Sequence, residues 1–383
     1  MKIESIELIP VSVPYKHQEI SSVVDRAGIT EVIVKMKTNE GHVGWGEAPR
    51  IASAEVIIKA IESMIPVLLN QDPWQNQLLE SHIYKDANWQ WSQMTANLAY
   101  GALDMALWDI CGKDVSKPIY KLIGGNLRKS VDYFYYLQWD TMKNFIRQCE
   151  DGVEKGYKVF YLKIGLNEVL EEKLIKKLRE IIGPKRKIRL DVNMAWSITQ
   201  ARRLINNWDL KYDIDFVEAP VKIQPLDLMK DLKGSVTSSL CVNEGLWQES
   251  EFYGILNSRC GEYLCYSHYF VGTIRKFLSL ANYANFMGWQ ICKHTHGELG
   301  LTAAIGQHLM LTVPNACEGN QQTAQNMASD ILQEEIPITS SNTWGLIDKP
   351  GLGIEIDESK LQFFHKKFVE NGEYKLYGDK FPI

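Results

Sequence analysis

The spacing of apolar and polar residues divides the chain into two regions with different patterns. Over roughly the first 125 residues, alternation predicts strands at 3–13, 30–36 and 43–48, because successive side chains of a strand point to opposite faces. Helical spacing follows at about 54–69 and 95–113. We therefore expect an antiparallel sheet followed by helices. The polar segment 14–28 is long enough to form a mobile flap between the first two strands.

From about residue 130, short apolar strands alternate with helical patterns. The predicted strands are 131–139, 159–165, 187–194, 215–219, 240–244, 262–267, 290–294 and 316–318. Eight strands at this spacing, with helices between them, are typical of a parallel (β/α) barrel. The tail contains Gly351-Leu352-Gly353 and a lysine-rich helix, and we expect it to fold back onto the first domain. The predicted domains are 1–125, 126–325 and 326–383.

Charge and composition indicate a soluble protein with no nucleic-acid or membrane partner. The chain has 42 Lys and Arg against 47 Asp and Glu, a net charge of -5, whereas nucleic-acid-binding domains normally carry a basic stripe. No apolar run reaches the roughly 18 residues that cross a bilayer, and the first residues lack the apolar region of a signal peptide. We expect a cytoplasmic protein. Its seven cysteines include no Cys-x-x-Cys pair, so they are expected to be reduced, buried and used as small apolar residues.

Three predicted barrel strands in succession end in a carboxylate. Asp191, Glu218 and Glu244 follow one another at spacings of 27 and 26 residues, which correspond to one strand and one helix each. Because the active sites of such barrels lie at the carboxyl ends of the strands, the three acids are expected to meet there. Carboxylates that close repel one another unless a cation compensates their charge. A hard divalent ion, Mg²⁺ first, fits such ligands; the alternative is three separate solvated loop carboxylates.

Other strand ends carry candidate acids and bases. Lys163 ends the second predicted strand, and a lysine that is partly desolvated near a metal can lose its proton and act as a base. His294 ends the seventh strand, on the opposite face, where it can serve as acid or base; its alternative role is a hydrogen-bonded core histidine. His296 falls in the following loop and is a weaker candidate. Glu318, at the end of the eighth strand, is expected to donate a hydrogen bond to substrate when protonated.

With these residues in order, the sequence resembles the enolase superfamily, and within it the mandelate racemase/muconate lactonizing enzyme group. The resemblance covers nearly the whole chain and includes the segments Gly44-Trp45-Gly46-Glu47-Ala48, Ala106-Leu107-Trp108-Asp109 and Pro350-Gly351-Leu352-Gly353. It implies a (β/α)7β modified TIM barrel with an N-terminal α+β capping domain, in which Mg²⁺ is held by the three acids named above. It also implies abstraction of a proton α to the carboxylate of a small substrate, with the metal stabilising the enediolate. Homo-oligomers are usual in this family.

Two strand ends depart from the family patterns. Members with two catalytic lysines carry Lys-x-Lys on the second strand and another lysine on the sixth, but here Tyr161 and Ser267 stand at two of those positions. Mandelate racemase-like members pair the seventh-strand histidine with a sixth-strand aspartate. His294 matches that histidine, whereas Ser267 replaces the aspartate, and Asn243-Glu244 also favours this side of the group. Without the aspartate, His294 is expected to be a weaker base that still works as an acid.

These departures lead to a hypothesis of dehydration. Lys163 removes the α-proton of a hydroxycarboxylate, with sugar acids as the expected class, and His294 protonates the departing β-hydroxide, assisted by Tyr161 as a hydrogen-bond donor. The alternatives are a racemase, epimerase or cycloisomerase of a carboxylate, and a barrel that binds metal and ligand without turnover.

Specificity is expected to come from the capping domain. The flap residues 15–17 and the loop 48–51 are the candidate segments, in which Lys16 and Arg50 would meet a distal anionic group of the substrate. Asn193, two residues after Asp191, is a further candidate for substrate binding.

Overall fold

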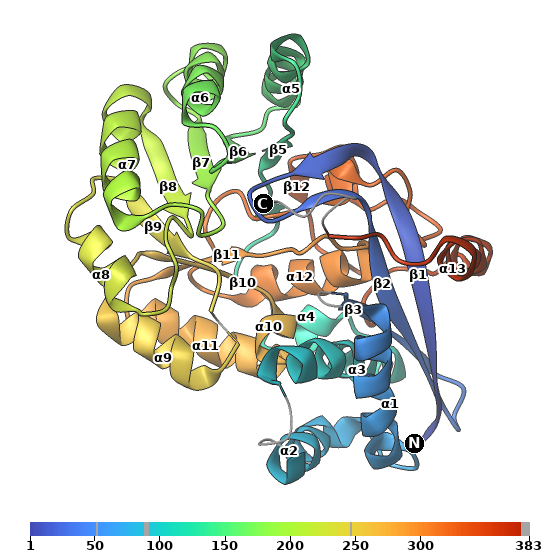
Figure 1. Ribbon diagram of the computed structural model, residues 1–383. Helices are drawn as coiled ribbons and strands as arrows, with labels where there is room; N and C mark the ends of the chain where they lie inside the picture. Colours follow the sequence, from blue (N-terminus) through green and yellow to red (C-terminus); the bar gives the residue numbers. More distant parts are fainter. Residues whose placement is uncertain (51–52, 88–91, 246, 377–383) are drawn as a thin grey trace.

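The computed structural model describes residues 1–50, 53–87, 92–245 and 247–376. It contains an antiparallel sheet, a curled parallel sheet with helices around it, and a C-terminal segment that returns to the first sheet (Figure 1). The predicted fold class, a modified (β/α)7β barrel with an N-terminal α+β capping domain, is confirmed. Within the described residues, no helix has the length and apolar character needed to cross a bilayer.

The capping sheet has three antiparallel strands in the order β1-β2-β3. These are β1 (Ile3–Ile20), β2 (Asp25–Thr38) and β3 (Val43–Pro49). The segment 14–28, predicted to lie between the first two strands, instead continues both strands as a hairpin with a register shift between Pro14 and Glu19. Its polar residues pair across the hairpin, as Glu19 does with Arg26. The hairpin therefore ends in a paired tip.

The helices of the capping domain pack against this sheet at very short range. They are α1 (Ala54–Leu68), α2 (Asn76–Ala87), α3 (Gln93–Asp114) and α4 (Ile119–Leu122), with a 3-10 turn η1 (Pro73–Gln75). Helix α3 is buried along most of its length. Gly44 and Gly46 of β3 lie so close to α3 that a Cβ on either one would collide with the backbone carbonyl of Ala106 or Ala102. Glycine is required there by this close approach.

Seven parallel strands form the barrel sheet, in the order β11-β10-β9-β8-β7-β6-β5. Their bounds are β5 (Tyr135–Leu137), β6 (Val159–Lys163), β7 (Lys187–Asp191), β8 (Ile214–Glu218), β9 (Ser239–Val242), β10 (Tyr263–Tyr266) and β11 (Gln290–Lys293). The predicted eighth strand at 316–318 is wrong. In this described segment the ring closes through single bridges, Ala316 with Ile291 and Asn320 with Tyr133.

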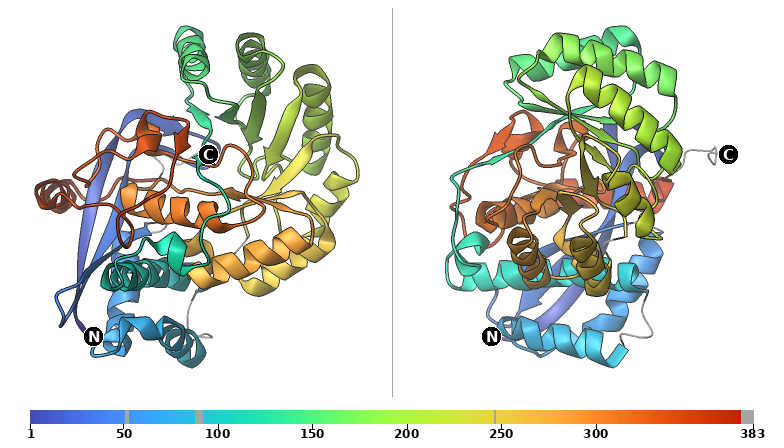
Figure 2. Two further views of the ribbon diagram at one scale, coloured as in Figure 1. Left: turned by 180° about the vertical axis from the view of Figure 1, so that it is seen from behind. Right: turned by 90° about the vertical axis from the view of Figure 1, so that its left-hand side faces the viewer.

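Helices cover the outside of the barrel sheet (Figure 2). They are α5 (Met142–Glu154), α6 (Glu168–Ile182), α7 (Ile198–Tyr212), α8 (Asp227–Lys233), α9 (Glu249–Ser258), α10 (His268–Val271), α11 (Ile274–Phe286) and α12 (Gly300–Thr312). Several begin at a polar residue whose side chain accepts a hydrogen bond from the first turn, as at Thr141, Asn167, Ser197 and Thr273. Such caps satisfy amide groups that the helix itself leaves unpaired.

The C-terminal segment runs back along the capping domain. It contains the 3-10 turns η2 (Ala324–Asn326) and η3 (Pro337–Thr339), the strand β12 (Thr343–Trp344), which pairs with β4 (Val131–Asp132), and the helix α13 (Glu358–Asn371). Helix α13 packs against β1, and the two lie side by side in Figures 1 and 2. Residues after α13 reach the hairpin tip, where the Asp25 amide donates to the Leu376 carbonyl at 2.8 Å.

Candidate active site

A cavity of about 200 Å³ lies where the β1–β2 hairpin meets the carboxyl ends of the barrel strands. The capping hairpin contributes Glu19, Val23, Val24 and Arg26 to its lining. The barrel contributes residues from six strand ends and the loops that follow them, including Tyr136, Tyr161, Lys163, Asn193, Asn243, Glu244, Phe270, His294, Thr295, His296, Gln321 and Thr323. The cavity thus combines both domains.

Strand register places a lysine and two carboxylates side by side beneath this cavity. Lys163, Asp191 and Glu218 are register partners on the neighbouring strands β6, β7 and β8. Asp191 is 1% exposed, and its Oδ2 accepts hydrogen bonds from Lys163 Nζ at 2.6 Å and from the Tyr161 hydroxyl at 2.5 Å. Its Oδ1 accepts a hydrogen bond from the backbone N–H of Asn193 at 2.9 Å. Asp191 is therefore fixed by three donors.

The other two acids of the predicted metal site are buried in unfavourable surroundings for a negative charge. Burial, followed by repulsion from Asp191, raises the pKa of Glu218 well above its ordinary value and that of Glu244 to about 7. Gln321 Nε2 donates to both oxygens of Glu218, at 3.1 and 3.0 Å. Glu244 Oε1 accepts from Asn193, whereas its Oε2 is buried without a hydrogen-bond partner among the described residues.

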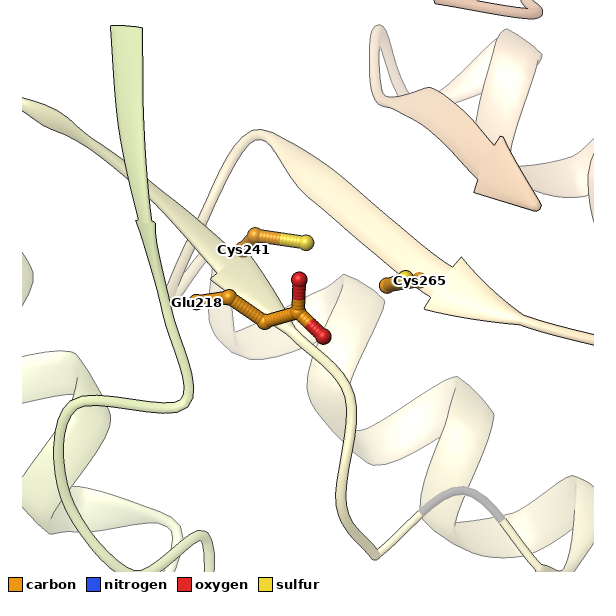
Figure 3. A group of neighbouring side chains, drawn as sticks. All are labelled: Glu218, Cys241 and Cys265. Atoms are coloured by element: carbon orange, nitrogen blue, oxygen red, sulfur yellow. The ribbon is translucent and has the colours of Figure 1, made fainter. Parts of the chain in front are cut away.

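This donor set fits a divalent cation. A cation would compensate the repulsion that, after burial, raises both pKa values, and it would give the unpartnered Glu244 oxygen a ligand role. Carboxylate oxygens are the ligands that Mg²⁺ prefers. Within the described residues, however, the three potential ligand atoms found within 4.8 Å of one another belong to Glu218, Cys241 and Cys265 (Figure 3).

Lys163 is held between Asp191 and Asn193. Its Nζ donates to Asp191 at 2.6 Å and to Asn193 Oδ1 at 3.0 Å. Burial lowers the pKa of Lys163, but the carboxylates of Asp191, Glu19 and Glu218 together outweigh burial, and the net pKa is raised. The lysine is thus a cation in this state, and a metal ion that shares Asp191 would weaken the interaction that keeps it charged.

Two histidines line the face of the cavity opposite β6. His294 is buried, and its Nδ1 has no hydrogen-bond partner among the described residues. Burial, followed by His296 and Lys163, lowers the pKa of His294 well below its ordinary value, so the ring is neutral. The Ser267 hydroxyl donates to the backbone carbonyl of His294 and leaves the ring free. His296, ranked lower from the sequence, also lines the cavity, and burial lowers its pKa to about 3.

The capping hairpin supplies site residues that the sequence did not reveal. Glu19 is buried and the side chain of Arg26 is 10% exposed, and the two form an ion pair at 2.6 Å at the edge of the cavity. The Tyr136 hydroxyl of the barrel donates to Glu19 Oε1 at 2.7 Å, and Arg26 donates to the carbonyl of His296. The sequence predicted a flap for this segment. The one signal that could have revealed the ion pair was the presence of opposite charges, Glu19 and Arg26, on the two arms of a possible hairpin.

Two of the predicted site residues lie outside this cavity, and the expected position of Glu318 beside it is wrong. Glu318 forms ion pairs with Lys158 at 3.1 Å and with Lys187 at 3.5 Å, at the amino ends of β6 and β7. Because the eighth strand does not form, Gln321 is the residue that reaches the cavity there. Lys16 is exposed and donates to a backbone carbonyl at Gln325, outside the cavity.

The remaining predicted substrate contacts do line the cavity. Arg50 forms an ion pair with Glu373 at 3.2 Å and donates to the Tyr374 carbonyl. The side-chain amide of Asn193 accepts a hydrogen bond from Lys163 through its oxygen and donates one to Glu244 through its nitrogen. Tyr161 also lines the cavity, although its hydroxyl donates to Asp191. Residue 51, the last of the predicted loop, lies outside the described residues.

The position of the cavity at the carboxyl ends of the strands is that of an active site in α/β-barrel enzymes. The chain belongs to the mandelate racemase/muconate lactonizing enzyme group of the enolase superfamily. Residues 6–124 match the mandelate racemase / muconate lactonizing enzyme N-terminal domain, and residues 144–360 match the enolase C-terminal domain-like family. The protein is thus an enolase-superfamily enzyme.

Similar proteins include isomerases and lyases. N-succinyl-L-Arg/Lys racemase of Bacillus cereus is 27% identical over 379 residues, covering 94% of this chain and 97% of the racemase. Its crystal structure has a TM-score of 0.87 at 25% identity, covering 95% and 98% of the two chains. Arabinonate dehydratase of Saccharolobus solfataricus is 26% identical over 341 residues, covering 88% and 91%. A dipeptide epimerase of Enterococcus faecalis, complexed with Mg and L-Leu-L-Tyr, has the same fold, with a TM-score of 0.86 at 20% identity and coverage of 93% and 100%.

Proposed function

We propose that the protein is a Mg²⁺-dependent lyase that removes the α-proton of a hydroxycarboxylate, a sugar acid, and eliminates the β-hydroxide. One observation carries the proposal. Lys163 and His294 line the same cavity from strands β6 and β11, which are five places apart in the curled sheet, and the His294 ring has no carboxylate partner among the described residues. A base on one face and an acid on the other are what an elimination requires.

Lys163 is the group placed to take the α-proton. Its Nζ is fixed by Asp191 and Asn193 at the edge of the cavity, so the amine is positioned before substrate enters. Asp191, Glu218 and Glu244 would hold Mg²⁺, which supplies stabilisation of the negative charge that develops on the substrate carboxylate. Tyr161 holds Asp191 in place through its hydroxyl and keeps its own proton, because burial raises its pKa.

His294 is the group placed to protonate the departing hydroxide. Its ring is neutral in the described state because burial lowers its pKa; the negative charge of a bound carboxylate would raise that pKa, so that the ring takes up a proton from solvent before elimination. That proton goes to the β-hydroxide, which leaves as water, while the proton taken by Lys163 returns to solvent.

The lining supports a substrate that carries hydroxyl groups. Beside the acids and bases, the cavity is bordered by the hydroxyls of Thr295 and Thr323 and the amide of Asn243. Asn243 Nδ2 donates to the Cys265 carbonyl at 2.8 Å, so the side-chain oxygen of Asn243 is left to accept a hydrogen bond from a substrate. A polyhydroxylated acid supplies such donors.

A racemase or epimerase is the second candidate, and the neutral His294 ring favours it. A neutral imidazole is ready to accept a proton, so Lys163 and His294 form a two-base pair on opposite faces of the cavity. The relatives include N-succinyl-L-Arg/Lys racemase and an L-Ala-D/L-Glu epimerase of Clostridium acetobutylicum.

Incubation with Mg²⁺ and a panel of sugar acids in D₂O separates these reactions. Dehydration is expected to yield a 2-keto acid, detected as its semicarbazone. Exchange of the α-proton for deuterium without loss of water, on sugar acids or on N-acylated amino acids, would replace the lyase by the racemase. A panel that gives neither product nor exchange would count against both and favour a barrel that only binds metal and ligand.

A further inference from the structure

Four of the seven cysteines form a row inside the barrel, directly below the proposed Mg²⁺ site. Cys241, Cys265 and Cys292 lie on the adjacent strands β9, β10 and β11, and Cys317 follows at the position of the missing eighth strand. Neighbouring thiols contact one another along the row, and together with Phe216 they form a buried cluster separate from the main core. These thiols had been expected to serve as ordinary small apolar residues.

A carboxylate completes the row at one end. Glu218 is the register partner of Cys241 on the next strand, and its side chain extends toward the two nearest sulfur atoms (Figure 3). One carboxylate oxygen and the Sγ atoms of Cys241 and Cys265 all lie within 4.8 Å of one another. At the other end, the buried guanidinium of Arg189 donates to Cys317 Sγ at 3.8 Å.

We propose that this row contains a second metal site, which binds a soft or borderline d¹⁰ cation such as Zn²⁺ through Cys241, Cys265 and Glu218. Thiolates select such cations over Mg²⁺. Ligand atoms on one tetrahedral zinc ion lie roughly 3.5–3.8 Å apart. The side chains therefore need to close by about 1 Å, which small side-chain rotations supply. Each thiol that binds releases its proton.

Glu218 has a different neighbour on each side, and this links the two sites. Toward the cavity it accepts both hydrogen bonds from Gln321, and away from it lie the two thiols. If the Glu218 carboxylate binds a cation together with the two thiols, it is no longer available as a ligand for Mg²⁺. Occupation by a soft cation is therefore expected to weaken Mg²⁺ binding, a consequence that rests on the proposed function, whereas the thiol site itself does not.

Cadmium reports directly on thiolate ligands and needs no turnover. The chelator-treated full-length protein, kept reduced, is titrated with Cd²⁺ while the ultraviolet thiolate-to-metal charge-transfer absorption is recorded. We expect a band that saturates at one equivalent and persists in excess Mg²⁺. Because the row is buried, a second sample is refolded in the presence of Cd²⁺. If neither sample shows the band, the proposal is overturned, whatever the enzyme's activity.

Variants locate the ligands. The double variant C241S/C265S is expected to lose the band, and the triple variant C111S/C149S/C260S, which changes buried cysteines in α3, in α5 and after α9, is expected to keep it. A band that survives in the double variant, or disappears in the triple variant, contradicts the assignment. Cadmium-113 NMR of the wild-type protein covers the case of a double variant that does not fold. A resonance in the range of sulfur ligands supports the site, and one in the range of oxygen ligands alone refutes it.

Discussion

Tyr161→Phe tests whether Asp191 is a metal ligand held by the residues around it. The substitution removes the hydroxyl that donates to Asp191 Oδ2 at 2.5 Å, while the ring keeps its stacking on Phe134 at a centroid distance of 4.3 Å. A hydrogen bond to a charged group contributes about 1.5–3 kcal/mol, and loss of a residue that orients a metal ligand typically costs about 10–100-fold in affinity. The Mg²⁺ dissociation constant is therefore expected to rise by about 10–100-fold, with the fold intact.

Isothermal titration of the chelator-treated protein with Mg²⁺ measures this change. The matched control is Tyr157→Phe, which removes a hydroxyl at the other end of β6, where it donates to the Ser341 carbonyl at 3.0 Å. The control is expected to leave the Mg²⁺ affinity unchanged. An unaltered affinity in Tyr161→Phe, or equal losses in both variants, would show that Mg²⁺ binding by Asp191 does not depend on the hydrogen bond from Tyr161.

Three further predictions concern the metal site, the packing inside the capping domain and the hairpin. The raised pKa of Glu244, about 7, means that the folded protein holds a proton that the unfolded chain has lost. The contribution of Glu244 to the stability of the metal-free protein, measured as the difference in thermal unfolding between wild type and Glu244→Gln, should therefore fall as pH rises from about 5 to 7, and Mg²⁺ should reduce that fall. A Mg²⁺ effect independent of pH would contradict this. Gly46→Ala is expected to cost about 1–3 kcal/mol in denaturant unfolding, because its Cβ meets α3, whereas Gly234→Ala, with open space, should be near neutral; equal effects would refute the close packing. Arg26→Ala should raise KM and cost about 3–5 kcal/mol of stability, because it leaves the buried Glu19 carboxylate without its ion-pair partner. Lys16→Ala on the same hairpin should change neither quantity. Similar kinetics in the two variants would show that Arg26 is not part of the site.

The barrel and the neighbouring positions of its acids were predictable because the βα repeat is regular. One strand and one helix occupy 26 or 27 residues between successive strand-end acids. In the structure, spacings of 28 and 27 residues put Lys163, Asp191 and Glu218 in register on adjacent strands. Parallel pairing brings strand ends to one side of a sheet, so local spacing alone was sufficient there.

The hairpin and the last barrel position were not predictable in this way. Glu19 is polar by type but buried, because Arg26 and Tyr136, from another strand and another domain, compensate it. Local pattern does not contain such distant partners. Glu318 was placed by assuming a full eighth strand, and since only single bridges form, the residue that reaches the cavity is Gln321.

The thiol row shows the same limit. The four cysteines are spread over 77 positions of the sequence, from Cys241 to Cys317, and each alone fits a small apolar residue. Their contact depends on the inward direction of each side chain in neighbouring strands, which the sequence pattern does not give for strands buried on both faces.

In the proposed reaction, Lys163 exchanges protons with the α-carbon of a carboxylate substrate. Deuterium incorporation at the α-position, followed by NMR in D₂O with Mg²⁺, measures this step whether water is later lost or not. Exchange or 2-keto product is expected with the wild-type protein and with Lys158→Ala, at the other end of β6, and neither is expected with Lys163→Ala. Undiminished α-proton exchange in Lys163→Ala would contradict this role of Lys163.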